Sequence, residues 1–320
     1  MNIKTGVYPD PQDFRDVPYE PTIGAAQLPS TYDLESEIGE LKKEDQNGSL
    51  SCVAQAFSKY AEALEKIENG RFTDLSAKFI YSRIYLPQGG AYLRDGAKLL
   101  ANLGDALEAD DPSYPNTEQA LKVASNSPAT LERALMFRAK GYASIWHQGD
   151  PTLIKQAIFE NKGVVTAVWG SNQGWGQALV RPPQAGEETW GHAIFFVGWT
   201  TYQGQECFIF INSWGESWGD KGRGYLPMSY LETGNVFSLW TIQDLPDNYR
   251  EQTQMLQLVR AKGQTDVYAI NGNKRHLVLN RQAFDRGVEL GFWSGKIADW
   301  EPEQLAALQE GYVLVIPDSF

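Results

Sequence analysis

The sequence predicts an α+β protein in which a mainly helical half precedes a mainly β half, with a small, mostly β module after them. Before Gly163, apolar residues recur at three- and four-residue spacing, which is the period of an amphipathic helix. After Gly163 the apolar segments are short, rich in β-branched and aromatic residues, and separated by glycine-rich turns, as is typical of strands. A polar stretch at 245–255 separates these two halves from a module at 255–320.

The helical half is expected to begin after an extended arm. Residues 1–27 are rich in Pro, Asp and Gly, and a residue before proline is kept out of the helical region, so we expect no helix there. Helical spacing starts at Ser51 and continues to Asn69-Gly70, an Asn/Gly pair that commonly ends a helix. Further helices are expected over 76–86, 95–103, 117–124, 128–140 and 151–161.

The β half and the last module are expected to contain strands joined by turns. A hairpin is expected over 267–279, because Asn271-Gly272 supplies the positive φ angles of a tight turn. The strands expected in the β half are Val164–Trp169, His192–Thr200, Glu206–Asn212 and Gly224–Pro227.

Composition and charge argue against several classes of protein. The chain has 320 residues, 42% of them hydrophobic, which is enough for one full core and a second small one. Its net charge of −12 argues against nucleic-acid binding, which needs a basic face. There is no run of about 18 apolar residues, and the first residues lack the apolar core of a secretory signal. We therefore expect no membrane association and a cytoplasmic location.

Cysteine and histidine are scarce. The only cysteines are Cys52 and Cys207, and the only histidines are His147, His192 and His276. Two thiols allow at most one disulfide and fit a reducing compartment. A zinc site with four nitrogen or sulfur ligands would need nearly all five residues, at spacings that do not suit it. We therefore expect no metal and no other cofactor.

Cys52 is a candidate nucleophile because it lies in the first turn of the helix that begins near Ser51. A thiol is a good nucleophile only as thiolate, and a helix N-terminus beside an imidazolium favours that form. Ser49 or Ser51 is expected to cap the helix. Taken alone, Cys52 fits a small buried packing residue equally well.

Three other residues complete a possible catalytic set. His192 follows a glycine and opens one expected strand, and Asn212 ends the next. An amide oxygen that accepts from the far imidazole N–H fixes the tautomer and the ring angle of a catalytic histidine. Gln46 precedes Cys52 and has a side-chain N–H to offer a developing oxyanion. Each residue alone fits a structural role, but the ordered set indicates nucleophilic catalysis.

Three segments that contain these residues resemble the active-site blocks of the papain family of cysteine peptidases. They are 46–57 around the cysteine, 191–199 around the histidine, and 212–225, which begins Asn-Ser-Trp-Gly. The resemblance runs in the family's order from about 28 to 245, and weaker matches lie at Leu28-Pro29, Leu75-Ser76, Gly89-Gly90, Tyr114-Pro115 and 154–168. It implies a two-lobed, papain-like fold with a helical left lobe and a β-barrel-like right lobe over 28–245.

The resemblance also implies roles for the candidate residues. Cys52 would be the nucleophile, His192 its base, Asn212 the group that orients the histidine, and Gln46 the oxyanion donor. Trp214 would shield the His–Asn hydrogen bond from water. The implied activity is peptide hydrolysis through a thioester acyl-enzyme. Two alternatives stay open, namely a non-catalytic binding protein on the same scaffold and a transpeptidase or ligase in which an amine replaces water.

The chain departs from the family pattern at several points. Ser49 stands where the family usually has a cysteine, and the partner cysteines are absent too, so the fold must hold without the usual bridges. Val53 replaces the usual tryptophan after the nucleophile, which is a packing residue. Instead of the family's long helical inhibitory propeptide, only about 27 residues precede the start of the resemblance.

A substrate pocket is also implied by the resemblance. Gly90 corresponds to the glycine that hydrogen-bonds the substrate backbone. The walls and floor of the pocket for P2, the second residue before the scissile bond, would be Tyr92, Val168, Trp190, Ala193 and Ile242. All five are apolar, so we expect an apolar P2 residue to be preferred, although each fits ordinary core packing as well.

The two ends of the chain carry further expectations. An extended, proline-rich arm can lie along a cleft, and as a tethered segment it would act at millimolar effective concentration, so we expect residues 1–27 to be inhibitory. The alternative is an arm packed behind the fold or disordered. The module at 255–320 has no catalytic set. We expect His276 to be solvated or packed and Trp293 and Trp300 to form a small core. The module would recognise an unidentified partner or glycan.

Overall fold

The computed structural model describes residues 6–22, 24–146, 149–243, 257–271, 274–278, 280–281, 284–285 and 296–310. By its contacts the chain divides into two compact units. The first comprises 1–124 and 137–245, and the second comprises 125–136 and 246–320. His147, Trp293 and the turn at 272–273 lie outside the described residues.

The helices of the first unit surround α2, Cys52–Asn69, which is buried from Cys52 to Glu65 and packs against β6. The helix ends at Gly70, whose φ of 64° is left-handed, and this confirms the expected Asn/Gly stop. Ser76 caps α3 by accepting from the Phe79 N–H. The other helices are α1 Leu34–Ile38, α3 Ala77–Ile84, α4 Leu93–Asn102, α5 Glu118–Leu121 and α7 Thr152–Asn161.

The strands of the first unit form a sheet in the order β4-β9-β5-β6-β7-β8, and the short β2, Tyr32–Asp33, also pairs with β6. The bounds are β4 Gly141–Ser144, β5 Val164–Ser171, β6 Thr189–Tyr202, β7 Gln205–Ile211, β8 Arg223–Pro227 and β9 Val236–Gln243. The four expected strands are therefore confirmed, while β4 and β9 were not expected. A short 3-10 helix, η3 Met228–Thr233, joins β8 to β9.

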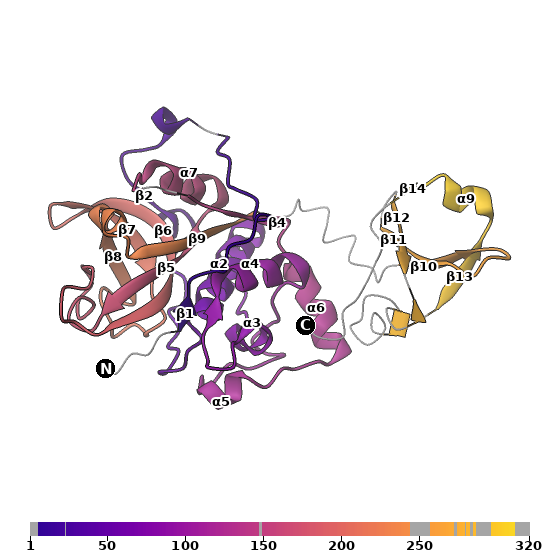
Figure 1. Cartoon of the computed structure of the whole chain (residues 1–320), viewed down its shortest axis with the longest axis horizontal. Coiled ribbons are helices and arrows are strands. Elements are labelled where there is room, and N and C mark those ends of the chain that lie inside the picture. Colours follow the sequence, from indigo (N-terminus) through magenta and orange to yellow (C-terminus); the bar gives the residue numbers. More distant parts are fainter. Residues whose placement is uncertain are drawn as a thin grey trace. The chain divides into compact units, whose positions relative to one another are not determined.

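The sheet has a buried core on each side. One core joins α2 to residues such as Val165, Ala193 and Phe195, and the other contains Val168, Trp190 and Phe196. Successive residues of β5 and β6 point to opposite faces of the sheet. One face packs against α2 and the other against the second core, and β6 carries His192. Figure 1 shows α2 running beside this sheet.

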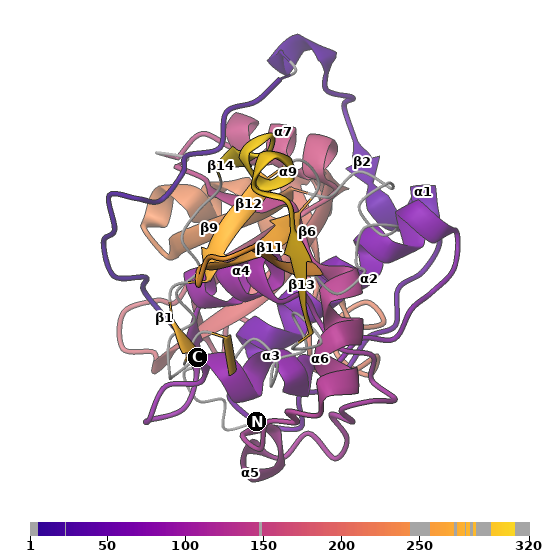
Figure 2. The same cartoon turned by 90° about the vertical axis from the view of Figure 1, so that its right-hand side faces the viewer.

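The N-terminal arm belongs to the first unit. Its first strand, β1 Val7–Tyr8, pairs in parallel with β3, Ala91–Tyr92. The indigo trace in Figures 1 and 2 then passes β4, reaches η1, Ala25–Gln27, and continues to β2. Residues 6–22 of the arm contain no helix and lie along the fold, whereas Ala25–Gln27 form a short 3-10 helix that was not expected.

The second unit contains α6, Pro128–Ala134, and a five-stranded sheet in the order β13-β10-β11-β12-β14. The expected hairpin is confirmed by the antiparallel pairing of β11 with β12. A small core holds Val259, Ala261 and Leu305, and Trp300 packs against it. The remaining bounds are η2 Leu135–Phe137, which crosses the unit boundary, β10 Gln257–Ala261, β11 Val267–Asn271, β12 Lys274–Val278, β13 Ile297–Trp300, α9 Pro302–Ala306 and β14 Gln309–Glu310.

The structure bears on two further expectations, which concern a disulfide and a membrane-spanning helix. Cys52 and Cys207 are both buried and free, so no disulfide is formed. Among the helices that the structure describes, none combines the length and the apolar character needed to cross a bilayer.

Candidate active site

Cys52 is the first residue of α2, and the N-terminus of this helix is directed at its sulfur. Ser51 is the N-cap residue but makes no capping bond with its side chain, contrary to expectation, because its hydroxyl lies 2.8 Å from that of Ser49. The backbone N–H groups of Ala193, Val53 and Cys52 itself interact with the sulfur and lower its pKa. No capping side chain occupies the backbone N–H groups at the start of α2, so these groups can stabilise a thiolate or an oxyanion.

Burial works against ionisation at the site. It raises the pKa of the Cys52 thiol to about 12, against the lowering effect of the backbone amides. It also lowers the pKa of His192 to about 4, against the hydrogen bond that the ring donates to the Asn212 oxygen, which favours the charged ring. Burial therefore favours the neutral form of both the thiol and the imidazole in this closed state.

His192 is held by Asn212. The imidazole Nε2 lies 2.8 Å from the Asn212 side-chain oxygen, which also accepts from the Ser213 backbone N–H at 2.8 Å. The Asn212 backbone N–H donates to the Gly222 carbonyl at 2.9 Å, which fixes the end of β7. The bond to Asn212 occupies one ring nitrogen and leaves Nδ1 for another partner.

Three tryptophans surround the histidine ring. Trp214 stacks on it with ring centroids 4.6 Å apart, and Trp190 and Trp175 present their edges at 6.0 and 5.9 Å. All three are buried, so the His192–Asn212 bond lies in an apolar surrounding. Sequence reasoning missed Trp175. The one local feature that could have indicated it is its position between Gly174 and Gly176, which is typical of a turn. In the structure the N–H groups of Gly174 and Trp175 both donate to the Ser171 carbonyl at this turn.

Gln46 connects the cysteine segment to the asparagine segment. Its side-chain Nε2 donates to the Ser49 carbonyl at 2.5 Å, and its Oε1 accepts from the Ser213 hydroxyl at 2.6 Å. Its backbone N–H donates to the Ser213 carbonyl at 2.9 Å. One Nε2 hydrogen is used in this state, so the second is available to an oxyanion.

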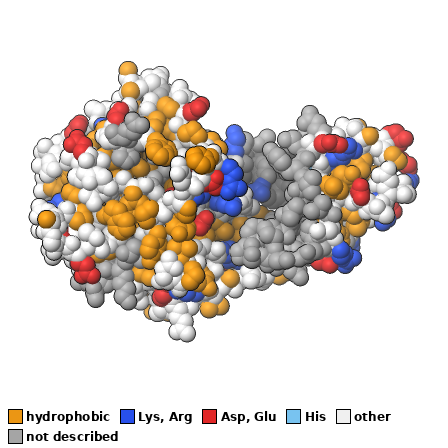
Figure 3. Space-filling model, in the orientation of Figure 1, with side chains coloured by type: hydrophobic (Ala, Val, Ile, Leu, Met, Phe, Trp, Pro, Cys, Tyr) orange, Lys and Arg blue, Asp and Glu red, His pale blue; other side chains and the backbone are white. Residues whose placement is uncertain are grey.

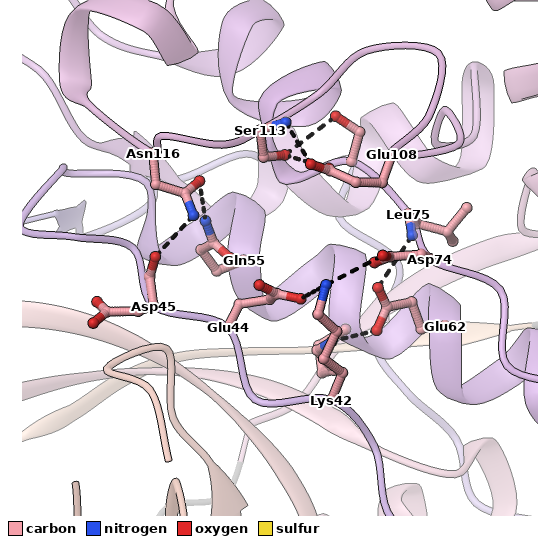
Figure 4. Close-up of polar contacts among 12 residues, drawn as sticks. Lys42, Glu44, Asp45, Gln55, Glu62, Asp74, Leu75, Glu108, Ser113 and Asn116 are labelled. Carbon is pink, nitrogen blue, oxygen red and sulfur yellow. Dashed lines mark hydrogen bonds and ion pairs between the residues drawn. The ribbon is translucent and has the colours of Figure 1, made fainter. Parts of the chain in front are cut away.

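The loop that carries Gln46 is fixed by polar contacts on its outer side (Figure 4). The Asn116 amide donates to the Asp45 carbonyl at 2.8 Å, and its oxygen lies 3.5 Å from the Gln55 amide of α2. Further along, Lys42 pairs with Glu44 at 2.8 Å. These contacts hold the loop next to the first turn of α2.

The residues expected to form the P2 pocket lie on four strands of the first unit, β3, β5, β6 and β9. Val168 pairs across β5 and β6 with His192, and Trp190 shares its core. Tyr92 pairs with Tyr8 of the arm. Ile242 instead pairs with Tyr142, six positions along β9 from Val236, the residue that faces Val168. Ile242 belongs to the same buried core as Cys52, Ala193 and Val7.

The arm covers the site. The Gly6 N–H donates to the Gly191 carbonyl at 2.9 Å, and the Gly6 carbonyl accepts from the Ala91 N–H at 3.1 Å. A Cβ added to Gly6 would lie 2.7 Å from the Cys52 sulfur. Gly90 does not bond the arm, since its N–H donates to the Tyr81 hydroxyl at 3.0 Å. A Cβ at Gly90 would lie 2.9 Å from the Gly6 carbonyl oxygen, so the glycine permits the close approach.

Fold and site together match the class of thiol-dependent enzymes, with a cysteine at a helix start, a histidine that an asparagine holds, and the Ala193 N–H next to that histidine bonded to the cysteine sulfur. The model of the family described as "Papain family cysteine protease" matches residues 28–236. The chain therefore belongs to the papain family of cysteine proteases.

Individual relatives agree with this assignment. A cysteine protease of Blomia tropicalis is 25% identical over 228 residues, which are 67% of this chain and 66% of the relative. The digestive cysteine proteinase 2 of Homarus americanus is 28% identical over 199 residues, 60% of this chain and 58% of the relative. This chain thus spans about two thirds or less of these two proteins. The structure of xylellain, a cysteine protease from Xylella fastidiosa, is 25% identical with a TM-score of 0.64, covering 76% of this chain and 97% of that one.

Proposed function

We propose that this chain hydrolyses peptide bonds with Cys52 as nucleophile, His192 as base, Asn212 as the orienting group and Gln46 as an oxyanion donor. The observation that carries the proposal is the 2.8 Å contact between His192 Nε2 and the Asn212 oxygen. It leaves Nδ1 of a neutral ring to take the thiol proton, which is how a general base activates a nucleophile. Trp214, stacked on the ring, excludes water from this bond.

The chemistry then follows from the groups around the sulfur. The thiolate attacks the peptide carbonyl, and the negative charge that develops on its oxygen is stabilised by the helix-start amides and by the free Nε2 hydrogen of Gln46. The imidazolium gives its proton to the leaving amine, which leaves a thioester. Water, deprotonated by the same ring, hydrolyses the thioester and regenerates the thiol. No metal or other cofactor takes part in these steps.

An apolar P2 preference is supported by the arm itself. Val7 follows the glycine that covers the sulfur, and its side chain is completely buried in the core that contains Ala91 and Ala193. A valine therefore occupies a position next to the nucleophile from which water is excluded. The proposed pocket residues are Tyr92, Val168, Trp190, Ala193 and Ile242.

We propose that residues 1–27 inhibit the peptidase at 28–245. Support comes from the two backbone hydrogen bonds of Gly6 and from its closeness to Cys52. A chain shortened to begin at Pro9 should show higher kcat/KM and faster thiol labelling than the full chain, and added peptide with the sequence of residues 1–9 should reverse both. Equal rates in the two chains would contradict inhibition by the arm.

Two coarser expectations remain proposals. A cytoplasmic location is supported by two cysteines that are both free. The module at 255–320 would act as an accessory unit that recognises a partner or a glycan.

The test of the proposed function is peptide-library cleavage by the purified protein beside its Cys52→Ala variant. Cleavage should require Cys52 and should favour Val, Leu or Phe over Arg or Lys at P2. A product extended by an added amine would point to transpeptidation through the same thioester. Library cleavage that persists unchanged in Cys52→Ala would overturn the mechanism.

A further inference from the structure

A groove of about 860 Å³ lies between the arm and the edge of the sheet. Arm residues between Asp10 and Pro18 line it together with Arg94 of α4, the last residue of β4 and the two that follow it (144–146), and residues 237–240 of β9. Hydrophobic side chains are widely exposed on the face of the first unit shown in Figure 3. Two of the groove's aromatic residues are largely open to solvent, since Phe14 is 93% and Trp146 is 75% exposed.

Both the sheet and the arm lead from the groove toward the catalytic residues. On the sheet side, Val236 pairs with Val168, which pairs with His192, and the groove wall begins at the next residue, Phe237. On the arm side, Asp10 follows the strand that begins beside Gly6 at the sulfur. A substrate that occupies the cleft therefore has a path into the groove within a few residues.

The arm has two parts that are held differently. The tip, residues 6–8, is held by strand pairing with β3 and by the bond from Gly6 to Gly191. The following segment is fastened to the body by its own contacts. Asp10 accepts from the Arg94 backbone N–H at 3.0 Å and from the Trp240 indole N–H at 2.8 Å. Asp16 pairs with the Arg94 guanidinium.

Further fastening lies beyond the groove. The Ser144 N–H donates to the Val17 carbonyl at 2.9 Å, and the Tyr19 N–H donates to the Ser144 carbonyl at 2.8 Å. The Tyr19 hydroxyl donates to Glu160 at 2.6 Å. None of these contacts involves the tip, so residues 10–19 can keep their place when the tip leaves Cys52.

The groove combines aromatic surface with a small excess of negative charge. Three carboxylates, Asp10, Asp13 and Asp16, face one guanidinium, Arg94. Arg15 pairs with Asp13 but its side chain is 90% exposed, and counting it still leaves one net negative charge. The two groups that donate to Asp10 are both neutral. A long aliphatic stem that ends in a cation matches such a surface, because the stem covers aromatic area and the cation is attracted by ring faces and carboxylates.

We propose that this groove is a substrate subsite built in part by the arm, and that it takes a lysine or arginine side chain beyond the P2 residue. The inference rests on the proposed peptidase function. Residues 10–18 would then line a substrate-binding subsite in the active enzyme and contribute to its specificity. Trp146 would contact the bound side chain from the opposite side of the groove.

The test uses the full chain and fluorogenic peptides that share an apolar P2 residue and carry Lys, Glu or Phe at P3 or at P4. The Lys-to-Glu ratio of kcat/KM is measured, because the fraction of molecules with the tip displaced affects both peptides equally and cancels in the ratio. We expect a ratio of about fivefold to tenfold at one of the positions, from one cation–aromatic and one weak ionic contact.

Two variants and one control make the test specific. Asp13→Asn and Trp146→Ala should each lower the Lys-to-Glu ratio at least about twofold, while Glu206→Gln, an equal charge change on β7, should leave it unchanged. A native ratio near one at both positions, a preference for Phe over Lys, or a ratio that neither variant moves would overturn the proposed subsite. Absence of Cys52-dependent cleavage of every peptide would instead overturn the peptidase function itself.

Discussion

Replacing Val7 by alanine should activate the full chain. Val7 is completely buried in the closed state, and its side chain becomes exposed when the tip leaves the cleft. The substitution removes two methyl groups, each worth about 0.8 kcal/mol of burial, so the closed state loses about 1.5 kcal/mol relative to the open one. If closed molecules dominate, the open fraction and the apparent kcat/KM should both rise about tenfold.

The assay compares kcat/KM and the rate of Cys52 alkylation in the native chain, in Val7→Ala and in Val17→Ala. Val17 belongs to the same arm, but its side chain is 62% exposed, so its truncation should leave both rates unchanged. A thermal melt of each variant checks that the fold is retained. Unchanged or lower rates in Val7→Ala, with an unchanged melt, would refute the view that burial of this side chain holds the tip over the nucleophile.

Four other outcomes are expected. Cys52→Ala and His192→Ala should abolish turnover, whereas Asn212→Ala should leave measurable activity because it only orients the ring; peptide turnover of each purified, folded variant checks this. Gln46→Ala should lower kcat about 10²-fold through loss of one oxyanion donor, and a kcat equal to the native value would remove that role. Gly6→Ala should speed alkylation, since its Cβ would lie 2.7 Å from the sulfur; a native rate would contradict the contact. Because burial raises the pKa of the Cys52 thiol, the rate of alkylation of the full chain should still be rising between pH 7 and 9. In Gly6→Ala the rate of alkylation should stop rising at a lower pH than in the native chain, because water reaches the thiol and burial no longer raises its pKa. Identical plots of rate against pH for the two chains would argue against this.

Local patterns predicted the elements whose signals lie within one segment. The Asn69-Gly70 stop placed the end of α2, and the runs of β-branched and aromatic residues placed β5 to β8. The strands β1 and β9 were missed because they depend on distant partners. Val7 pairs with Ala91, and Trp240 pairs with Ser144 and with Val165. A two-residue strand has no periodicity of its own to detect.

The candidate site shows the same limit. Order along the chain indicated Cys52, His192, Asn212 and Gln46, because each lies at the start or end of a recognisable element or in the loop before it. The position of Ile242 could not be derived from local sequence, since it depends on how β9 pairs with β4 and β5, and a bulge at 167/168 shifts that register. Nothing in the local sequence relates Gly6 to the sulfur, so the arm's contact needed the structure.

Mass spectrometry of the intact chain after reaction with an electrophilic epoxide tests the central claim most directly. The account predicts one adduct, on Cys52 and not on Cys207, with activity lost in proportion to its formation. His192→Ala should slow this reaction strongly, because the ring no longer takes the thiol proton. Full peptidase activity in a chain that is completely modified at Cys52 would contradict the assignment of the nucleophile.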